Sequence, residues 1–179
     1  DSYMYLAGIY RRNEDYSAAM NILNKALKNN HKNSGISEAT ILWWKASVYD
    51  DMDDSENAVR LMEEALKKGR KQNKANLDKM LESMAQFYYS NEQYEASDAL
   101  YREMLKNDDS AQLPRIGLAR NMNAREEYDQ ALAMLDECIR FDSEYQEIYR
   151  FQMQAYEGKK EYKKMIDAMV LLFDKTEDF

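Results

Sequence analysis

The feature that most constrains how this chain can fold is a motif that occurs five times along it. Each copy places a bulky and a small side chain ahead of a large one that closes the motif, and the closing residues are Tyr10, Tyr49, Tyr88, Met122 and Tyr156. These positions lie 39, 39, 34 and 34 residues apart. A sequence that repeats with a period of about 20 to 50 residues predicts an array of similar, stacked units.

A second pattern follows each closing residue and has the spacing of one helical face. In the first unit it consists of Ala19, Leu23 and Ala26. The two patterns together resemble the tetratricopeptide repeat, whose unit is a pair of helices and whose period is about 34 residues. The resemblance covers essentially the whole chain, and the first two units each carry five extra residues (39 − 34) before the next unit begins.

The resemblance implies an all-α fold, an α-solenoid in which antiparallel helix pairs stack into a right-handed superhelix. We expect a single repeat domain with units over residues 1–34, 35–73, 74–110, 111–144 and 145–179. Because the frame of the first unit begins at the first residue, with no leading linker, we also expect the chain to be a piece of a longer protein.

Small side chains in the middle of each expected helix give a physical reason for this fold, because they let two backbones approach closely. They are Ala7, Ala46, Ala85 and Ala119 on the first helices, and Ala19, Ala58, Ser97 and Ala131 on the second helices. Residues that favour the start of a helix also occur where the repeat predicts that a helix begins. Asp53 and Asp54 precede a second helix, and Pro114 stands in a first turn. Ser143 and Gln146 have the spacing of a capping box.

The composition excludes several classes of protein. The chain has 33 acidic and 25 basic side chains, and its net charge of −8 disfavours a nucleic-acid partner, since that binding neutralises phosphates with Lys and Arg. No apolar run approaches the roughly 18 residues that span a bilayer, and the first residues do not form a secretory signal. We expect a soluble protein of the cytoplasm or periplasm, without a membrane partner.

Side chains for catalysis or metal binding are scarce. His31, the only histidine, lies after the first helix pair, and the only cysteine, Cys138, occupies a place for a small packing residue. We expect a solvated histidine and a buried, unreactive thiol. The acidic residues 50–54 fail to match a calcium loop because Glu56 replaces its glycine. The basic run 67–79 lacks the interleaved aromatic residues of nucleic-acid surfaces. The sequence predicts no catalytic residue, cofactor or metal.

In tetratricopeptide proteins the first helix of each pair lines a concave surface that receives an extended peptide or a partner's helix. Helical spacing projected onto that face selects Met4, Gly8, Arg11, Trp43, Ser47, Asp50, Glu82, Gln86, Tyr89, Ile116, Arg120, Asn123, Arg150, Gln154 and Glu157. Aromatic and arginine side chains anchor many protein interfaces, so Trp43, Tyr89, Arg120 and Arg150 are the expected anchors. The adjacent Trp44 points about 100° away from Trp43, and we expect it to pack between units.

We therefore expect a non-catalytic scaffold that binds a protein or peptide in its groove. The alternative is a sensory or regulatory module that binds a peptide or metabolite and passes a change to an attached effector. A clamp for a partner's C-terminal carboxylate is disfavoured, because only Lys79 supplies a matching cation in the first three units. Self-association is a further hypothesis, since the last helix carries Met165, Met169, Leu172 and Phe173 with no following unit to cover them.

Overall fold

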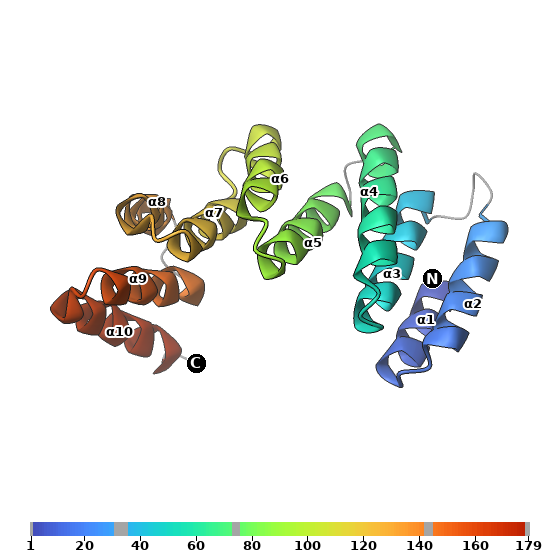
Figure 1. The fold of residues 1–179 in the computed structure, drawn as a ribbon, viewed down its shortest axis with the longest axis horizontal. Helices are drawn as coiled ribbons and strands as arrows, with labels where there is room; N and C mark the ends of the chain where they lie inside the picture. Colours follow the sequence, from blue (N-terminus) through green and yellow to red (C-terminus); the bar gives the residue numbers. More distant parts are fainter. Residues whose placement is uncertain (1, 31–35, 73–75, 142–144, 178–179) are drawn as a thin grey trace. The chain divides into compact units, whose positions relative to one another are not determined.

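In this computed structural model, residues 2–30, 36–72, 76–141 and 145–177 are described. Within these ranges the chain forms ten helices and no strand, which confirms the predicted all-α solenoid class (Figure 1). One pair of helices lies in each of the five predicted intervals. The helices are α1 (Ser2–Arg12), α2 (Tyr16–Lys28), α3 (Glu38–Asp51), α4 (Ser55–Gln72), α5 (Leu77–Ser90), α6 (Tyr94–Asn107), α7 (Gln112–Ala124), α8 (Tyr128–Phe141), α9 (Gln146–Gly158) and α10 (Tyr162–Glu177).

The chain divides into two compact units. The first runs over Asp1–Met84 and the second over Ala85–Phe179, so the division falls within α5. In the first unit α1 packs on α2, α2 on α3, and α3 on α4, while α1 also contacts α3. In the second unit α6 packs on α7, α7 on α8, α8 on α9, and α9 on α10, while α7 also contacts α9. The single repeat domain and the longer parent protein stay predictions.

The same backbone turn joins the two helices of every pair. One residue in each turn has left-handed φ angles of 58° to 61°, namely Glu14, Asp53, Glu92, Glu126 and Lys160. The amide of the next residue donates, over 2.8 to 2.9 Å, to the carbonyl of the residue that closes the sequence motif. This is the hydrogen bond of a Schellman turn, which satisfies a carbonyl at the helix end. The left-handed turn therefore follows the closing residue of the sequence motif at the same spacing in every helix pair.

The residue after the left-handed one starts the second helix, and it differs between the units. In the first unit Asp15 accepts a hydrogen bond from the amide of Ala18 at 3.0 Å, and Asp54 accepts one from the amide of Asn57 at 3.2 Å. Gln93 holds this place before α6 and makes no side-chain cap. The predicted cap at Asp54 is confirmed, whereas the predicted capping box begins at Ser143, which lies outside the described residues.

The predicted close packing is confirmed by the small side chains, since all eight alanine and serine positions singled out above are buried. They join larger residues in each unit, with Leu23, Ile41 and Val48 in the first core and Met122, Leu135 and Ile148 in the second. Two glycines of the second unit lie against tyrosine rings. A Cβ atom on Gly117 would lie 2.3 Å from the ring of Tyr101. Burial of apolar surface therefore follows the repeat frame in both units.

The last helix presents apolar side chains to solvent. Ile166, Met169, Val170 and Phe173 are each about half exposed. Of the residues expected to form an uncovered face, Met169 and Phe173 are exposed, while Met165 is half-buried. Among the helices of the described ranges, none combines the length and the apolar character that crossing a bilayer requires.

Candidate binding site

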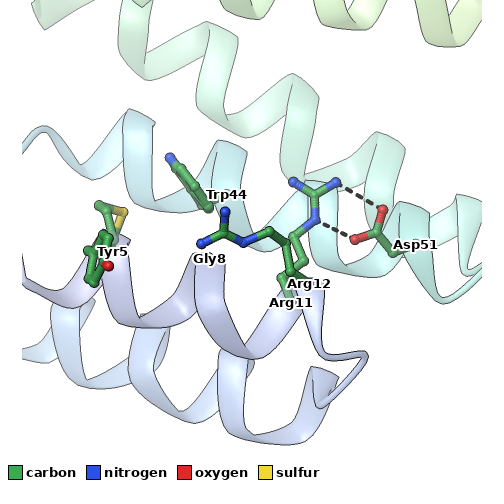
Figure 2. Close-up of a pocket in the computed structure, with 7 residues that line it drawn as sticks. Tyr5, Gly8, Arg11, Arg12, Trp44 and Asp51 are labelled. Atoms are coloured by element: carbon green, nitrogen blue, oxygen red, sulfur yellow. Dashed lines mark hydrogen bonds and ion pairs between the residues drawn. The ribbon is translucent and has the colours of Figure 1, made fainter.

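An open pocket of about 560 Å³ lies between the first helices of the two pairs in the first unit, α1 and α3 (Figure 2). Its lining combines apolar, aromatic and charged side chains, as binding pockets commonly do. The lining residues are Met4, Tyr5, Gly8, Arg11, Arg12, Trp44 and Asp51. Three predicted groove residues, Met4, Gly8 and Arg11, are among them. They lie on one face of α1 because their spacing of four and three residues matches the helical period.

Gly8 and Trp44 form the middle of the pocket. The Trp44 ring lies 3.5 Å from the place where a Cβ atom on Gly8 would stand, which is an ordinary van der Waals separation. Because Gly8 has no side chain, the surface of α1 leaves space beside the indole ring. The expectation that Trp44 packs between helix pairs agrees with this contact. The same residue also lines the pocket, which was not predicted from the sequence.

Arg11 and Asp51 connect the two helices at one end of the pocket. The Nη2 atom of Arg11 donates to Oδ1 of Asp51 at 2.9 Å, and its Nε atom donates to Oδ2, so the pair is bidentate. The hydrogen bond to Asp51 raises the pKa of Arg11 above its usual value. Burial raises the pKa of the neighbouring Asp50, and the negative charge of Asp51 adds to this effect. Because Arg11 and Asp51 neutralise each other, this end of the pocket carries little net charge.

Arg12 supplies the pocket with a cation that no described residue neutralises. In Figure 2 its guanidinium points toward the side of the pocket where Trp44 lies, away from the ion pair of Arg11 with Asp51. Arg12 is exposed, and none of the described residues forms an ion pair or a hydrogen bond with its side chain. A guanidinium placed this way can receive a planar anionic group through two parallel hydrogen bonds.

The residues of α3 that line the pocket are one position removed from those selected by the sequence. Trp43, Ser47 and Asp50 were expected, but Trp44 and Asp51 face α1. The Trp43 ring packs edge-on against Trp44 with centroids 6.2 Å apart, and Ser47 donates to the carbonyl of Trp43 in its own helix. A shift of one residue turns a helical face by about 100°. Any contribution of Trp43, Ser47 and Asp50 to a wider groove stays a prediction.

In the second unit, two of the expected anchors contact each other. The guanidinium carbon of Arg120 lies 3.8 Å from the centroid of the Tyr89 ring, a cation–π contact, and Nη2 of Arg120 donates to the Tyr101 hydroxyl at 3.1 Å. Tyr89 also packs against Tyr94, with centroids 5.6 Å apart. The role of Tyr89 and Arg120 as anchors for a partner stays a prediction.

The remaining predicted residues differ in exposure. Ile116 is 5% exposed and belongs to the core of the second unit, because α8 and α9 cover this side of α7. Asn123 is 3% exposed, and its amide donates to the carbonyl of Phe151 at 2.8 Å. The selection of these two as groove residues is corrected, since both pack within the fold. Glu82 is half-buried on α5, whereas the exposed residues are Gln86, Arg150, Gln154 and Glu157.

Groups with chemical reactivity do not gather at the pocket. The Cys138 thiol is fully buried, and burial raises its pKa to about 11, in agreement with the predicted unreactive thiol. His31 lies outside the described residues. Across the described ranges, no cluster of three His, Cys, Asp or Glu residues could hold a metal ion.

A second, smaller hollow of about 320 Å³ lies along α4 within the basic run. It is lined by Glu64, Lys67, Lys68 and Lys71. The Nζ atom of Lys68 lies 3.0 Å from Glu38 and 4.0 Å from Glu64, so carboxylates partly neutralise this surface. We therefore regard the α1–α3 pocket as the stronger candidate.

Comparison with solved structures gives the fold. BtubC (BKLC) from P. vanneervenii matches with a TM-score of 0.83 and 13% identity, over 98% of this chain and 79% of that chain. A putative kinesin light chain of Podosopora anserina with nearly identical TPR-like repeats matches with a TM-score of 0.76 and 16% identity, over 99% and 94%. MamA AMB-1 gives 0.70 and 12%, over 99% of both chains. The predicted TPR-like helical repeats are thereby supported.

Comparison with known sequences gives the family. No curated protein matches the chain. The model of one protein family, ChAPs (Chs5p-Arf1p-binding proteins), matches residues 5–169, which include every residue that lines the pocket except Met4. This match spans most of the five repeats, and the chain therefore belongs to the ChAPs family.

Proposed function

We propose that this chain is a non-catalytic, protein-binding scaffold and that the α1–α3 pocket receives part of its partner. The observation that carries the proposal is the pocket itself, in which aromatic side chains lie on an open surface with a guanidinium that has no counterion among the described residues. Aromatic and arginine side chains supply a large share of the binding energy at protein interfaces. The family description supports a protein partner, since it names proteins that bind Chs5p and Arf1p.

The partner we propose is a counterpart of Chs5p or Arf1p from the organism that makes this chain. The description of the family is the basis for this choice. A pocket of about 560 Å³ holds only a few side chains, so a stable complex needs contacts beyond it. We propose Arg150, an exposed first-helix residue of the second unit, as a separate contact with the partner.

A non-catalytic role is consistent with the side chains present. The buried thiol of Cys138 has a raised pKa and therefore does not provide a nucleophile near neutral pH. The pocket contains arginines and one paired aspartate, and this set lacks the acid and base pair that general catalysis uses. These features favour binding as the role of the pocket.

The test measures binding of the purified chain to purified counterparts of Chs5p and Arf1p by biolayer interferometry. We expect one of them to bind, and we expect Arg12→Glu to weaken that binding about tenfold. The matched control is Lys28→Glu. Lys28 is also an exposed cation in the last turn of a helix of the first unit, but it does not line the pocket. Absence of binding to both proteins would overturn the proposed partner.

A further inference from the structure

We infer that the α1–α3 pocket recognises an acidic side chain of a partner peptide, with an adjacent apolar side chain on Trp44. This inference rests on the proposed function and specifies the chemistry of the same pocket. Its basis is the charge of the lining. Arg11 and Asp51 form a bidentate pair, which leaves the guanidinium of Arg12 as the charge without a counterion among the described residues of the pocket.

The position of Arg12 determines which group can bind. Arg12, Gly8 and Trp44 line the same pocket, and in Figure 2 the Arg12 side chain points toward the part of the pocket where Trp44 lies. An anion bound to Arg12 there would share the pocket with the indole ring. A carboxylate accepts two parallel hydrogen bonds from a guanidinium, and this planar pairing selects it over a neutral amide. Asp and Glu side chains therefore match the cation of the pocket.

The apolar lining determines what accompanies the carboxylate. Met4 and Trp44 offer apolar surface within the same pocket, and methionine adapts its shape to different neighbours. A residue next to the acidic one can place an aliphatic or aromatic side chain against this surface. The pocket is open to solvent, so an extended segment can pass through it with its two ends outside. We therefore assign an internal acidic and apolar segment of a partner as the occupant.

The ion pair of Arg11 with Asp51 lines the same pocket as Arg12 and supplies a second test. Asp51 neutralises Arg11, and the amide in Asp51→Asn would leave Arg11 free to attract the same carboxylate. We expect this variant to bind an acidic peptide about three times more tightly, as an additional nearby positive charge does at a partly exposed site. A residue with a purely structural role would not give tighter binding when it is replaced.

The experiment uses the full chain and two synthetic peptides, acetyl-Gly-Ser-Leu-Asp-Leu-Ser-Gly-amide and the same peptide with Asn in place of Asp. Binding is followed by NMR through the amide of Gly8 and the indole N–H of Trp44. The two tryptophan signals are assigned with Trp43→Phe. We expect the Asp peptide to bind at least about five times more tightly than the Asn peptide and to shift both signals.

Variants then test the assignment of the residues. We expect Arg12→Glu to weaken Asp-peptide binding about tenfold, while Lys28→Glu leaves it unchanged. Gly8→Leu places a side chain in the middle of the pocket and should abolish binding. Thermal unfolding followed by circular dichroism checks that each variant is folded. Equal affinity for the two peptides, or unchanged binding by a folded Arg12→Glu variant, overturns the inference.

The outcomes also separate this inference from the proposed function. If a Chs5p or Arf1p counterpart binds and the peptides do not, the scaffold role is supported and the specificity for an acidic side chain is contradicted. If the Asp peptide binds through Arg12 and neither counterpart binds, recognition of an acidic side chain by the pocket is supported and the proposed partner is contradicted.

Discussion

Two contacts between first helices can be compared directly, because each lies within one compact unit. One joins α1 to α3, and the other joins α7 to α9. When the repeats are aligned on their closing residues, four positions of the contact correspond. In the first unit they are Gly8, Arg11, Trp44 and Asp51, and in the second unit they are Arg120, Asn123, Phe151 and Gly158.

The two contacts use their polar side chains differently. In the first unit, Arg11 and Asp51 pair at the edge of an open pocket, with side chains 33% and 29% exposed. In the second unit, Asn123 is buried and donates to the carbonyl of Phe151, while Arg120 lies on the ring of Tyr89. The comparison shows that one repeat frame can place either a partly exposed ion pair or a buried hydrogen bond between neighbouring first helices.

The second unit also buries a charged group that has no counterpart in the pocket of the first. Asp98 on α6 is 5% exposed. Its Oδ1 atom accepts a hydrogen bond from Asn121 at 2.8 Å, and its Oδ2 atom accepts one from Arg125 at 3.1 Å. A buried carboxylate with these partners is far more sensitive to change than an exposed ion pair, because removal of one member leaves the others unsatisfied.

Removal of Asp98 should therefore have the largest effect on stability. Asp98→Ala leaves the amide of Asn121 without its acceptor and Arg125 with Glu127 alone, and we expect a loss of about 3 kcal/mol. Asp51→Ala exposes Arg11 to water, and we expect a loss of at most about 1 kcal/mol. The measurement is urea unfolding by circular dichroism. Equal losses in the two variants would contradict the distinction between a buried and an exposed ion pair.

The two tryptophans make this measurement specific to one unit. Trp43 and Trp44 are the only tryptophans of the chain, and both belong to the first unit. Their fluorescence therefore follows unfolding of that unit, whereas circular dichroism follows the helices of both. We expect Asp98→Ala to change the dichroism transition more than the fluorescence transition, and a fluorescence change of the same size would show that the units unfold together.

Alanine at two glycines should change stability in opposite directions. At Gly117 the new Cβ would lie 2.3 Å from the ring of Tyr101, which is 3% exposed and has little room to move, so we expect a loss of about 2 kcal/mol. At Gly8 the new Cβ would lie 3.5 Å from Trp44, so no clash opposes the better helix propensity of alanine. We expect Gly8→Ala to gain up to about 1 kcal/mol. Thermal unfolding of both variants tests the difference in sign.

The start of the second helix offers a third contrast. Asp54 caps α4 through the amide of Asn57, whereas Gln93 at the matching place makes no side-chain cap. We expect Asp54→Ala to lower the free energy of unfolding by about 1 kcal/mol and Gln93→Asp to raise it by about 0.5 kcal/mol. Asp54→Asn serves as the control, because an asparagine still caps a helix. A loss in Asp54→Asn as large as in Asp54→Ala would show that the carboxylate charge, and not the cap, stabilises α4.

The fold could be predicted from the sequence because the information is local and repeated. Tyr10 and Tyr49 sit 39 residues apart, and their turn residues Glu14 and Asp53 are separated by the same interval. Small residues such as Ala19 and Ala58 are fully buried, as their positions in the motif indicate. Helical period and side-chain size together suffice to predict the pairs, since each pair packs mainly with its neighbours.

The site could be predicted only in part, because helix rotation depends on packing across units. Three predicted groove residues of α1, Met4, Gly8 and Arg11, line the pocket, but on α3 the side chains that line it are Trp44 and Asp51. Arg12 was not selected, because its place in the pocket and the pairing of Arg11 with a residue 40 positions away both depend on contacts between helix pairs. A preference for opposite charges between neighbouring first helices would have indicated Arg11 and Asp51.

The left-handed turns within the helix pairs are a feature that the two units share, so substitutions there should have small and equal effects on stability. Glu14 in the first unit and Glu92 in the second have φ angles of 60° and 58°, a region that strains side chains with a Cβ atom. Glycine relieves this strain, and the greater freedom of the unfolded chain offsets part of the effect. Glu14→Gly and Glu92→Gly should therefore each raise the free energy of unfolding by about 0.5 kcal/mol. Matched alanine variants at the same positions keep the Cβ atom and should gain nothing. Urea unfolding of the four variants decides the point. If only one glycine stabilises the chain, the common backbone turn does not bear equal strain in the two units, and the difference between them extends beyond the contacts of their first helices.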